Sequence, residues 1–125
     1  AEIIAEACMK LGNYREGLDC IDRVAAIPES QEEQYWRAEL MRRKGELLEL
    51  LGEREGALEY LQLSLEIAVA QHTPILVLRS ALSLFDFNDR TGLSPDAIHK
   101  ISEIYRQFPE KGASPEQERA RLILE

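Results

Sequence analysis

Apolar residues recur three or four positions apart along most of this chain, with charged residues between them. That spacing is typical of helices that bury one face and expose the other to water. The segment 97–108 follows it with Ala97, Ile101, Ile104 and Phe108. No segment alternates apolar and polar residues over a useful length, so we expect no strands. The pattern therefore predicts an all-α fold.

Three short stretches repeat with a period of 40 residues. Each has a glycine, a small residue five positions later and a branched aliphatic residue four positions after that: Gly12, Gly17 and Ile21; Gly52, Ala57 and Leu61; Gly92, Ala97 and Ile101. Self-similarity at a fixed period indicates one supersecondary unit repeated along the chain, each copy burying its apolar face against its neighbours. We therefore predict a single domain over residues 1–125, with antiparallel helical hairpins over 1–27, 31–72 and 74–108 that turn at these glycines.

Helix starts are marked by hydroxyl residues that can cap backbone N–H groups. Thr73, Ser94 and Ser114 each precede a proline, which favours the first position of a helix. Gln117 completes a capping box with Ser114. These signals predict a last helix over residues 114–125, which we expect to cap the end of the stack, as terminal units of repeat arrays do.

Residues 51–61, Leu-Gly-Glu-Arg-Glu-Gly-Ala-Leu-Glu-Tyr-Leu, resemble the signature of the tetratricopeptide repeat (TPR). Gly45 matches the small residue that lets the two helices of such a repeat approach closely, whereas Phe85 departs from the pattern in the third copy. The resemblance implies a right-handed solenoid of three repeats with a capping helix. The period of 40 residues exceeds the usual length of about 34, so a generic solenoid of helical hairpins is the alternative.

A narrower resemblance covers about two thirds of the chain. The segments 44–48, 65–71 and 78–84 look like the C-terminal repeat region of large bacterial regulators, as does Ser114-Pro115-Glu116 before the last helix. In those proteins the repeats follow a predicted ATPase module, itself attached to an adenylate-cyclase or transcription-activator domain. The resemblance implies a regulatory protein–protein interaction segment and brings no catalytic residue. Because the chain begins with Ala1, we expect it to be a piece of a longer protein.

The formal net charge of −8 narrows the class of partner. Phosphate binding needs a basic stripe, so this charge disfavours nucleic acid and anionic membrane surfaces. A basic or mixed-charge protein or peptide would be complementary. With only Cys8 and Cys20 as thiols and no signal peptide, a reducing cytoplasm is the favoured location.

No catalytic, metal or cofactor site is predicted. Carboxylates at the density seen near Glu53 and Glu55 are usually a solvated helix face. His72 and His99 have no cysteine or histidine at a ligand spacing. The residues around Gly52 lack the lysine and hydroxyl of a nucleotide-binding loop. We therefore expect a chain that is not an enzyme and holds no cofactor.

The candidate binding surface follows from the TPR resemblance, in which the first helix of each hairpin lines a concave face. The side chains that we expect on this face are Glu2, Glu6, Glu39, Arg42, Glu46, Glu49, Arg79 and Asp86. A mostly acidic surface with two arginines suits a basic or mixed-charge peptide or helix. The alternative is a structural role, in which the apolar first hairpin stacks on a second copy to make a homodimer. Trp36 is expected to pack against the neighbouring hairpin.

Overall fold

The computed structural model describes residues 2–26, 31–110 and 113–125, and for residues 2–5 and 31–35 it describes the backbone alone. The described chain forms seven helices and contains no strand. The helices are α1 (Glu2–Leu11), α2 (Tyr14–Ala25), α3 (Gln31–Leu50), α4 (Arg54–Ala70), α5 (Pro74–Thr91), α6 (Ala97–Arg106) and α7 (Pro115–Leu124). The all-α fold predicted from the apolar spacing is confirmed.

Three left-handed glycines turn the chain between α1 and α2, α3 and α4, and α5 and α6. The backbone angle φ is +78° at Gly12, +82° at Gly52 and +73° at Gly92, a region that glycine enters without a steric penalty from Cβ. After α3, the N–H of Glu53 donates to the carbonyl oxygen of Leu48 at 2.8 Å, which satisfies a carbonyl at the helix end. The predicted turns are confirmed at all three glycines.

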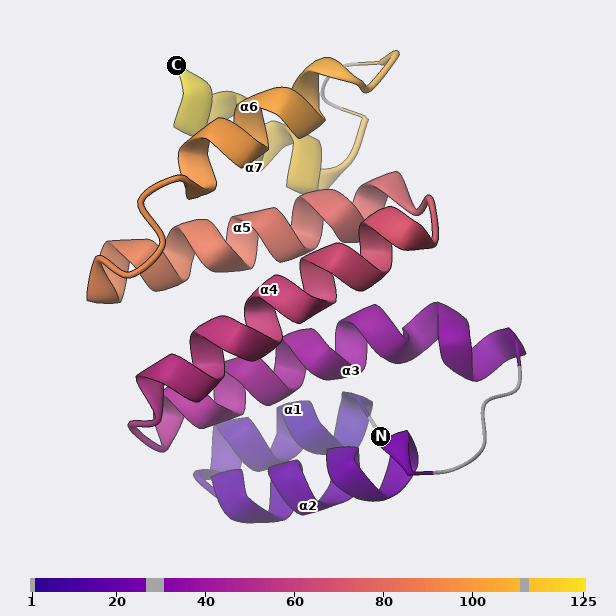
Figure 1. The fold of residues 1–125 in the computed structure, drawn as a ribbon, viewed down its shortest axis with the longest axis vertical. Helices are drawn as coiled ribbons and strands as arrows, with labels where there is room; N and C mark the ends of the chain where they lie inside the picture. Colours follow the sequence, from indigo (N-terminus) through magenta and orange to yellow (C-terminus); the bar gives the residue numbers. More distant parts are fainter. Residues whose placement is uncertain (1, 27–30, 111–112) are drawn as a thin grey trace.

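The helices stack so that the odd-numbered ones lie along one side (Figure 1). Each helix contacts the next one along the chain, and α3 also contacts α1 and α5, as α5 contacts α7. Within the described residues, α2 makes no comparable contact with α4, nor does α4 with α6. Odd helices therefore approach one another and even helices do not. We call the surface formed by α1, α3, α5 and α7 the odd-helix face.

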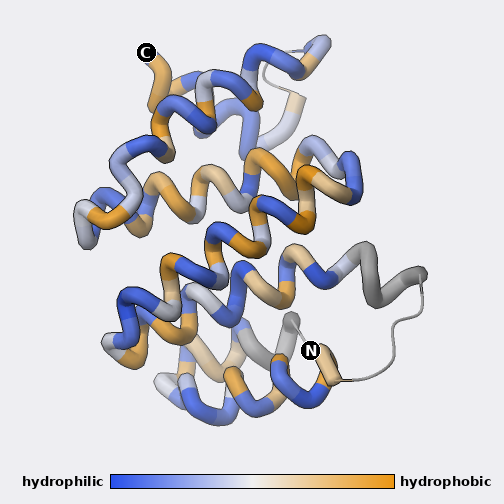
Figure 2. Tube along the Cα trace, in the orientation of Figure 1, coloured by the Kyte–Doolittle hydropathy of each residue, from blue (hydrophilic) through white to orange (hydrophobic). Residues whose placement is uncertain are grey.

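Apolar residues recur along every layer of the stack (Figure 2). Ile21, Leu47, Leu61, Leu78 and Ile101, one from each of α2 to α6, are almost completely buried. Burying an aliphatic side chain of this size stabilises a fold by about 1.5–3 kcal/mol. Each layer thus supplies side chains that only its neighbours can cover.

Two of the three predicted helix starts agree with the structure, and the third is shifted by two residues. The N–H of Gln117 donates to Oγ of Ser114 at 3.1 Å, so the cap of α7 is confirmed. Helix α5 begins directly after Thr73, although the Thr73 hydroxyl donates to a carbonyl oxygen of α4 instead of capping α5. Helix α6 begins at Ala97, two residues later than the Ser94 signal predicts, because a turn forms first, in which the Ser94 carbonyl accepts the N–H of Ala97 at 3.1 Å.

Gly45 lies where α3 packs closely on α4. A Cβ atom at this position would lie 2.8 Å from Cγ of Leu61 and 3.0 Å from the carbonyl oxygen of Ala57. Both distances are too short for carbon atoms in ordinary van der Waals contact. The prediction that Gly45 permits a close approach of the two helices is therefore confirmed.

We expect Gly45→Ala to lower the free energy of unfolding by about 1–3 kcal/mol, because the added methyl group overpacks this contact. Gly56→Ala is the matched control, since a Cβ there would lie 3.5 Å from Cδ1 of Leu48, an ordinary contact. Alanine at that position should stabilise the chain by about 0.5–1 kcal/mol through its higher helix propensity. Urea unfolding monitored by circular dichroism measures both, and equal losses would contradict the close approach at Gly45.

Candidate functional site

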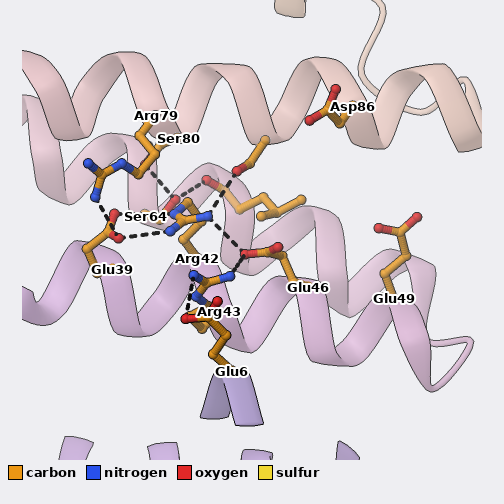
Figure 3. A network of polar contacts seen from close by, with 12 residues as sticks. Glu6, Glu39, Arg42, Arg43, Glu46, Glu49, Ser64, Arg79, Ser80 and Asp86 are labelled. Carbon is orange, nitrogen blue, oxygen red and sulfur yellow. Dashed lines mark hydrogen bonds and ion pairs between the residues drawn. The ribbon is translucent and has the colours of Figure 1, made fainter. Parts of the chain in front are cut away.

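Most of the side chains predicted for the binding face lie on the odd-helix face (Figure 3). They come from three helices: Glu6 of α1; Glu39, Arg42, Glu46 and Glu49 of α3; and Arg79 and Asp86 of α5. The side chain of Glu2 lies outside the part of the chain that the structure describes. The remaining predicted residues are not a set of free charges, because every one of them takes part in an ion pair within the chain.

Glu39 is the centre of this arrangement. Its side chain is 1% exposed and accepts two hydrogen bonds from Arg42, at 3.2 Å from Nε and 2.8 Å from Nη2. A third comes from Nη1 of Arg79 on α5, at 3.1 Å. The other terminal nitrogen of Arg79 donates to Glu116 of α7 at 3.0 Å. One buried carboxylate thus joins α3 to α5, and Arg79 extends the connection to α7.

The pKa values of the two central carboxyl groups move in opposite directions. Burial by itself would raise the pKa of Glu39, but the hydrogen bonds and positive charges of Arg42 and Arg79 outweigh it, and the net pKa is lowered. Burial raises the pKa of Glu46, because there the opposing charges of Arg42 and Arg43 are outweighed and Glu39 adds a repulsion. Ionised Glu39 therefore favours the folded state, whereas ionised Glu46 opposes it.

The sequence analysis missed four residues that complete the odd-helix face: Arg43, Arg90, Glu116 and Arg119. Arg90 donates two hydrogen bonds to Glu49, at 2.7 and 2.6 Å. Arg119 of α7 pairs through both terminal nitrogens with the carboxylate of Asp86. The sequence offered a signal for one of these pairs, since Arg90 follows Glu49 by 41 residues, close to the period of 40, whereas Arg119 follows Asp86 by 33 residues.

The odd-helix face is therefore almost neutral. The ion pairs of the predicted residues and their neighbours join six carboxylates to five guanidinium groups: Glu6, Glu39, Glu46, Glu49, Asp86 and Glu116 with Arg42, Arg43, Arg79, Arg90 and Arg119. Lys10 of α1 also pairs with Glu6, and Arg121 of α7 pairs with Glu118 and Glu125. The predicted surface, which the sequence presents as mostly acidic with two arginines, therefore holds nearly as many arginines as carboxylates, because contact between odd helices brings arginines of one layer onto the carboxylates of the next. Glu39 and Arg42 are also too buried to meet a partner.

We expect Glu39→Gln to lower the free energy of unfolding by about 3–5 kcal/mol near neutral pH, because one partner of a buried ion pair is removed. The stabilisation by Glu39 is complete above the pKa of an unfolded glutamate, about 4.3. It is lost as the pH falls through the lower pKa of the folded state. The difference in stability between wild type and variant should therefore shrink in acid.

Glu46→Gln is the matched control for that variant. Because the pKa of Glu46 is raised, its ionised form opposes folding and the neutral amide should cost less than it does at Glu39. As the pH falls, the stability of the wild type relative to this variant should rise. Urea unfolding between about pH 3 and 7 measures both slopes, and slopes of the same sign would refute the opposite roles of the two carboxyl groups.

A second feature lies between the even helices, where α4 and α6 both pack on α5. This α4–α6 groove encloses about 870 Å³, within the range of about 300–1,000 Å³ of ligand-binding pockets. Its apolar lining includes Leu65 and Val69 of α4, Ile75 of α5, Ile104 of α6 and Phe108 just after α6. Val69 is 53% exposed, so apolar surface is open to solvent here.

Polar residues mark the rim of the α4–α6 groove: His72, Lys100, Glu103 and Gln107. His72 follows α4 in a left-handed conformation, with φ of 55°. Nζ of Lys100 lies 3.4 Å from a carboxylate oxygen of Asp96, so its charge is paired. No ion pair joins Glu103 to another described residue. With histidine counted as neutral, Glu103 is thus the unpaired charge on the rim.

Trp36 is half-buried near the start of α3, with 50% of its surface exposed. It is not among the residues that line the α4–α6 groove. An exposed tryptophan at this place is a separate patch of apolar surface and not an extension of the groove.

Among the described residues, no group of three or more His, Cys, Asp or Glu side chains has an arrangement that would hold a metal ion. No helix of the described chain has both the length and the apolar character to cross a membrane. The chain matches no protein-family model, no curated protein and no solved structure. Its function is therefore inferred from its own residues.

Proposed function

We propose that this chain is a protein–protein interaction module that serves as a regulatory segment of a larger bacterial signalling or transcription-regulating protein. The observation that carries the proposal is the α4–α6 groove, an open surface with an apolar lining and a polar rim. Apolar surface that stays exposed on a folded chain commonly marks a place where another molecule binds. The bacterial and regulatory parts of the proposal rest on the resemblance of segments 44–48, 65–71 and 78–84 to such regulators. A cytoplasmic location is proposed because Cys8 and Cys20 are the only thiols.

In this proposal the fold is a TPR-like right-handed solenoid of three hairpins, with α7 as the capping helix. Supporting it are the positive φ angles at Gly12, Gly52 and Gly92, which recur every 40 residues. The close approach at Gly45 and the contacts between successive odd helices also agree with it. Helix α7 contacts both α5 and α6, as a covering helix should.

The partner in this proposal is a protein or peptide of basic or mixed charge. The net charge of −8 favours such a partner over an acidic one. On the odd-helix face the predicted contacts Glu6, Glu46, Glu49 and Asp86 are at least partly exposed, but a partner would have to exchange their ion pairs with arginines. Binding in the α4–α6 groove would require no such exchange of ion pairs, so this groove is the preferred surface for the partner.

A structural role in homo-oligomers is the second candidate. It is favoured by exposed apolar residues on the first and last helices, where Leu11 is 76% and Leu122 is 59% exposed. Stacking such ends on a second copy would continue the same kind of layer packing. In that case the chain would need no separate partner.

Two measurements separate these candidates. Sedimentation equilibrium should give a monomer across the micromolar range, and a protein captured by the native chain and then purified should bind it saturably in calorimetry. The control bait is an unrelated folded helical protein with the same net charge, which should not bind that protein. Concentration-dependent dimers without any such partner would favour the structural role and overturn the interaction module.

A further inference from the structure

The α4–α6 groove has the architecture of a helix-binding site. We infer that it receives an amphipathic α-helix of a partner protein, with aliphatic side chains in the groove and a lysine or arginine facing Glu103. The inference rests on the proposed interaction function and names the surface and the kind of partner. It assigns recognition to the even helices and not to the odd-helix face.

The shape of the groove follows from which helices pack together. Leu65 and Val69 of α4 form one wall and Ile104 of α6 forms the other. Both helices pack on α5, but no Cα atom of a described residue in one lies within 8 Å of a Cα atom in the other (Figure 1). Directly packed helices lie about 8–10 Å apart, so two backbones that share a neighbour and stay farther apart leave a furrow in which a third helix can contact both.

Proteins bind peptides as added strands, as proline-rich segments or as helices. The residues that line the groove favour a helix. Addition of a strand needs the open edge of a sheet, and the described chain contains no strand. Proline-rich segments dock into grooves lined by several aromatic rings, whereas Phe108 is the aromatic residue of this lining. An aliphatic furrow bounded by helices instead suits the apolar face of an amphipathic helix, presented at intervals of three or four residues.

The charges on the rim of the groove indicate which kind of residue the bound helix must carry beside its apolar face. Glu103 lies on the rim with no ion pair to another described residue, whereas the charge of Lys100 is paired with Asp96. The wall helix α4 exposes Glu59 and Glu66 and has no lysine or arginine after Arg54, so the acidic surplus extends along it. A basic residue beside the apolar stripe would pair with Glu103 and favour association from a distance.

The test is a selection from a display library of helical peptides randomised on all faces, with the full chain as the target. Enriched sequences should have aliphatic residues at helical spacing with a lysine or arginine beside them. The tightest peptide is then synthesised with its basic residue and with glutamate in its place. Fluorescence anisotropy gives the dissociation constant of each form.

Two variants link that binding to the groove. Val69→Glu should weaken binding by at least about tenfold, as the loss of one good apolar contact does, while the exposed site should leave thermal unfolding unchanged. Leu122→Glu, at an equally exposed leucine of α7, is its control and should bind like wild type. Glu103→Lys should reverse the preference between the two peptide forms, and Glu16→Lys on α2 should not.

The inference is overturned if no helical sequence is enriched, or if binding survives Val69→Glu. It is also overturned if Glu103→Lys leaves the charge preference unchanged. Self-association that Val69→Glu abolishes would assign the groove to a second copy of the chain and not to a partner helix. A natural partner whose binding depends on neither Val69 nor Glu103 would contradict this inference alone, because such a partner would still support the proposed interaction function.

Discussion

The buried carboxylate of Glu39 is the interaction on which the arrangement of the second and third hairpins depends. At 1% exposure it must have partners, since an unpaired buried charge is very costly, and these are Arg42 on its own helix and Arg79 on α5. A buried ion pair adds little net stability over apolar packing, but breaking it is expensive. Helices α3 and α5 are thereby held in one register. Nothing comparable ties α4 to α6 within the described chain, so the stack opens between them.

Charge is distributed unevenly between the two sides of the stack. The odd-helix face pairs its carboxylates with nearly as many arginines, so the net charge of −8 arises almost wholly elsewhere. Much of it lies on the turn before α4 and on α4 itself, where Glu53, Glu55, Glu59 and Glu66 are exposed. The acidic surplus therefore lies along α4, one of the two helices that bound the α4–α6 groove. Electrostatic steering would bring a basic partner toward this helix.

Features that depend on local backbone chemistry were predictable from the sequence. The turns at Gly52 and its equivalents follow from helix-end geometry, and the close approach at Gly45 follows from the match to a repeat signature. The pairing of Arg90 with Glu49 had only its separation of 41 residues as a signal, and that separation does not decide which side chains meet, because the pairing depends on how one layer is rotated on the next. The α4–α6 groove was missed for a related reason. It results from two helices whose described Cα atoms stay more than 8 Å apart, and periodicity within each helix carries no information about that separation.

The odd-helix face and the α4–α6 groove differ in which interactions a partner would have to break on binding. A partner on the odd-helix face must displace arginines from carboxylates such as Glu49 and Asp86, and every exchanged pair must be replaced by one at least as well matched. In the α4–α6 groove, binding releases water from Val69 and its apolar neighbours, which is favourable without any exchange. The ion pairs of the odd-helix face instead join the layers of the stack. The charges that first suggest a binding site in the sequence are therefore already engaged with one another within the chain.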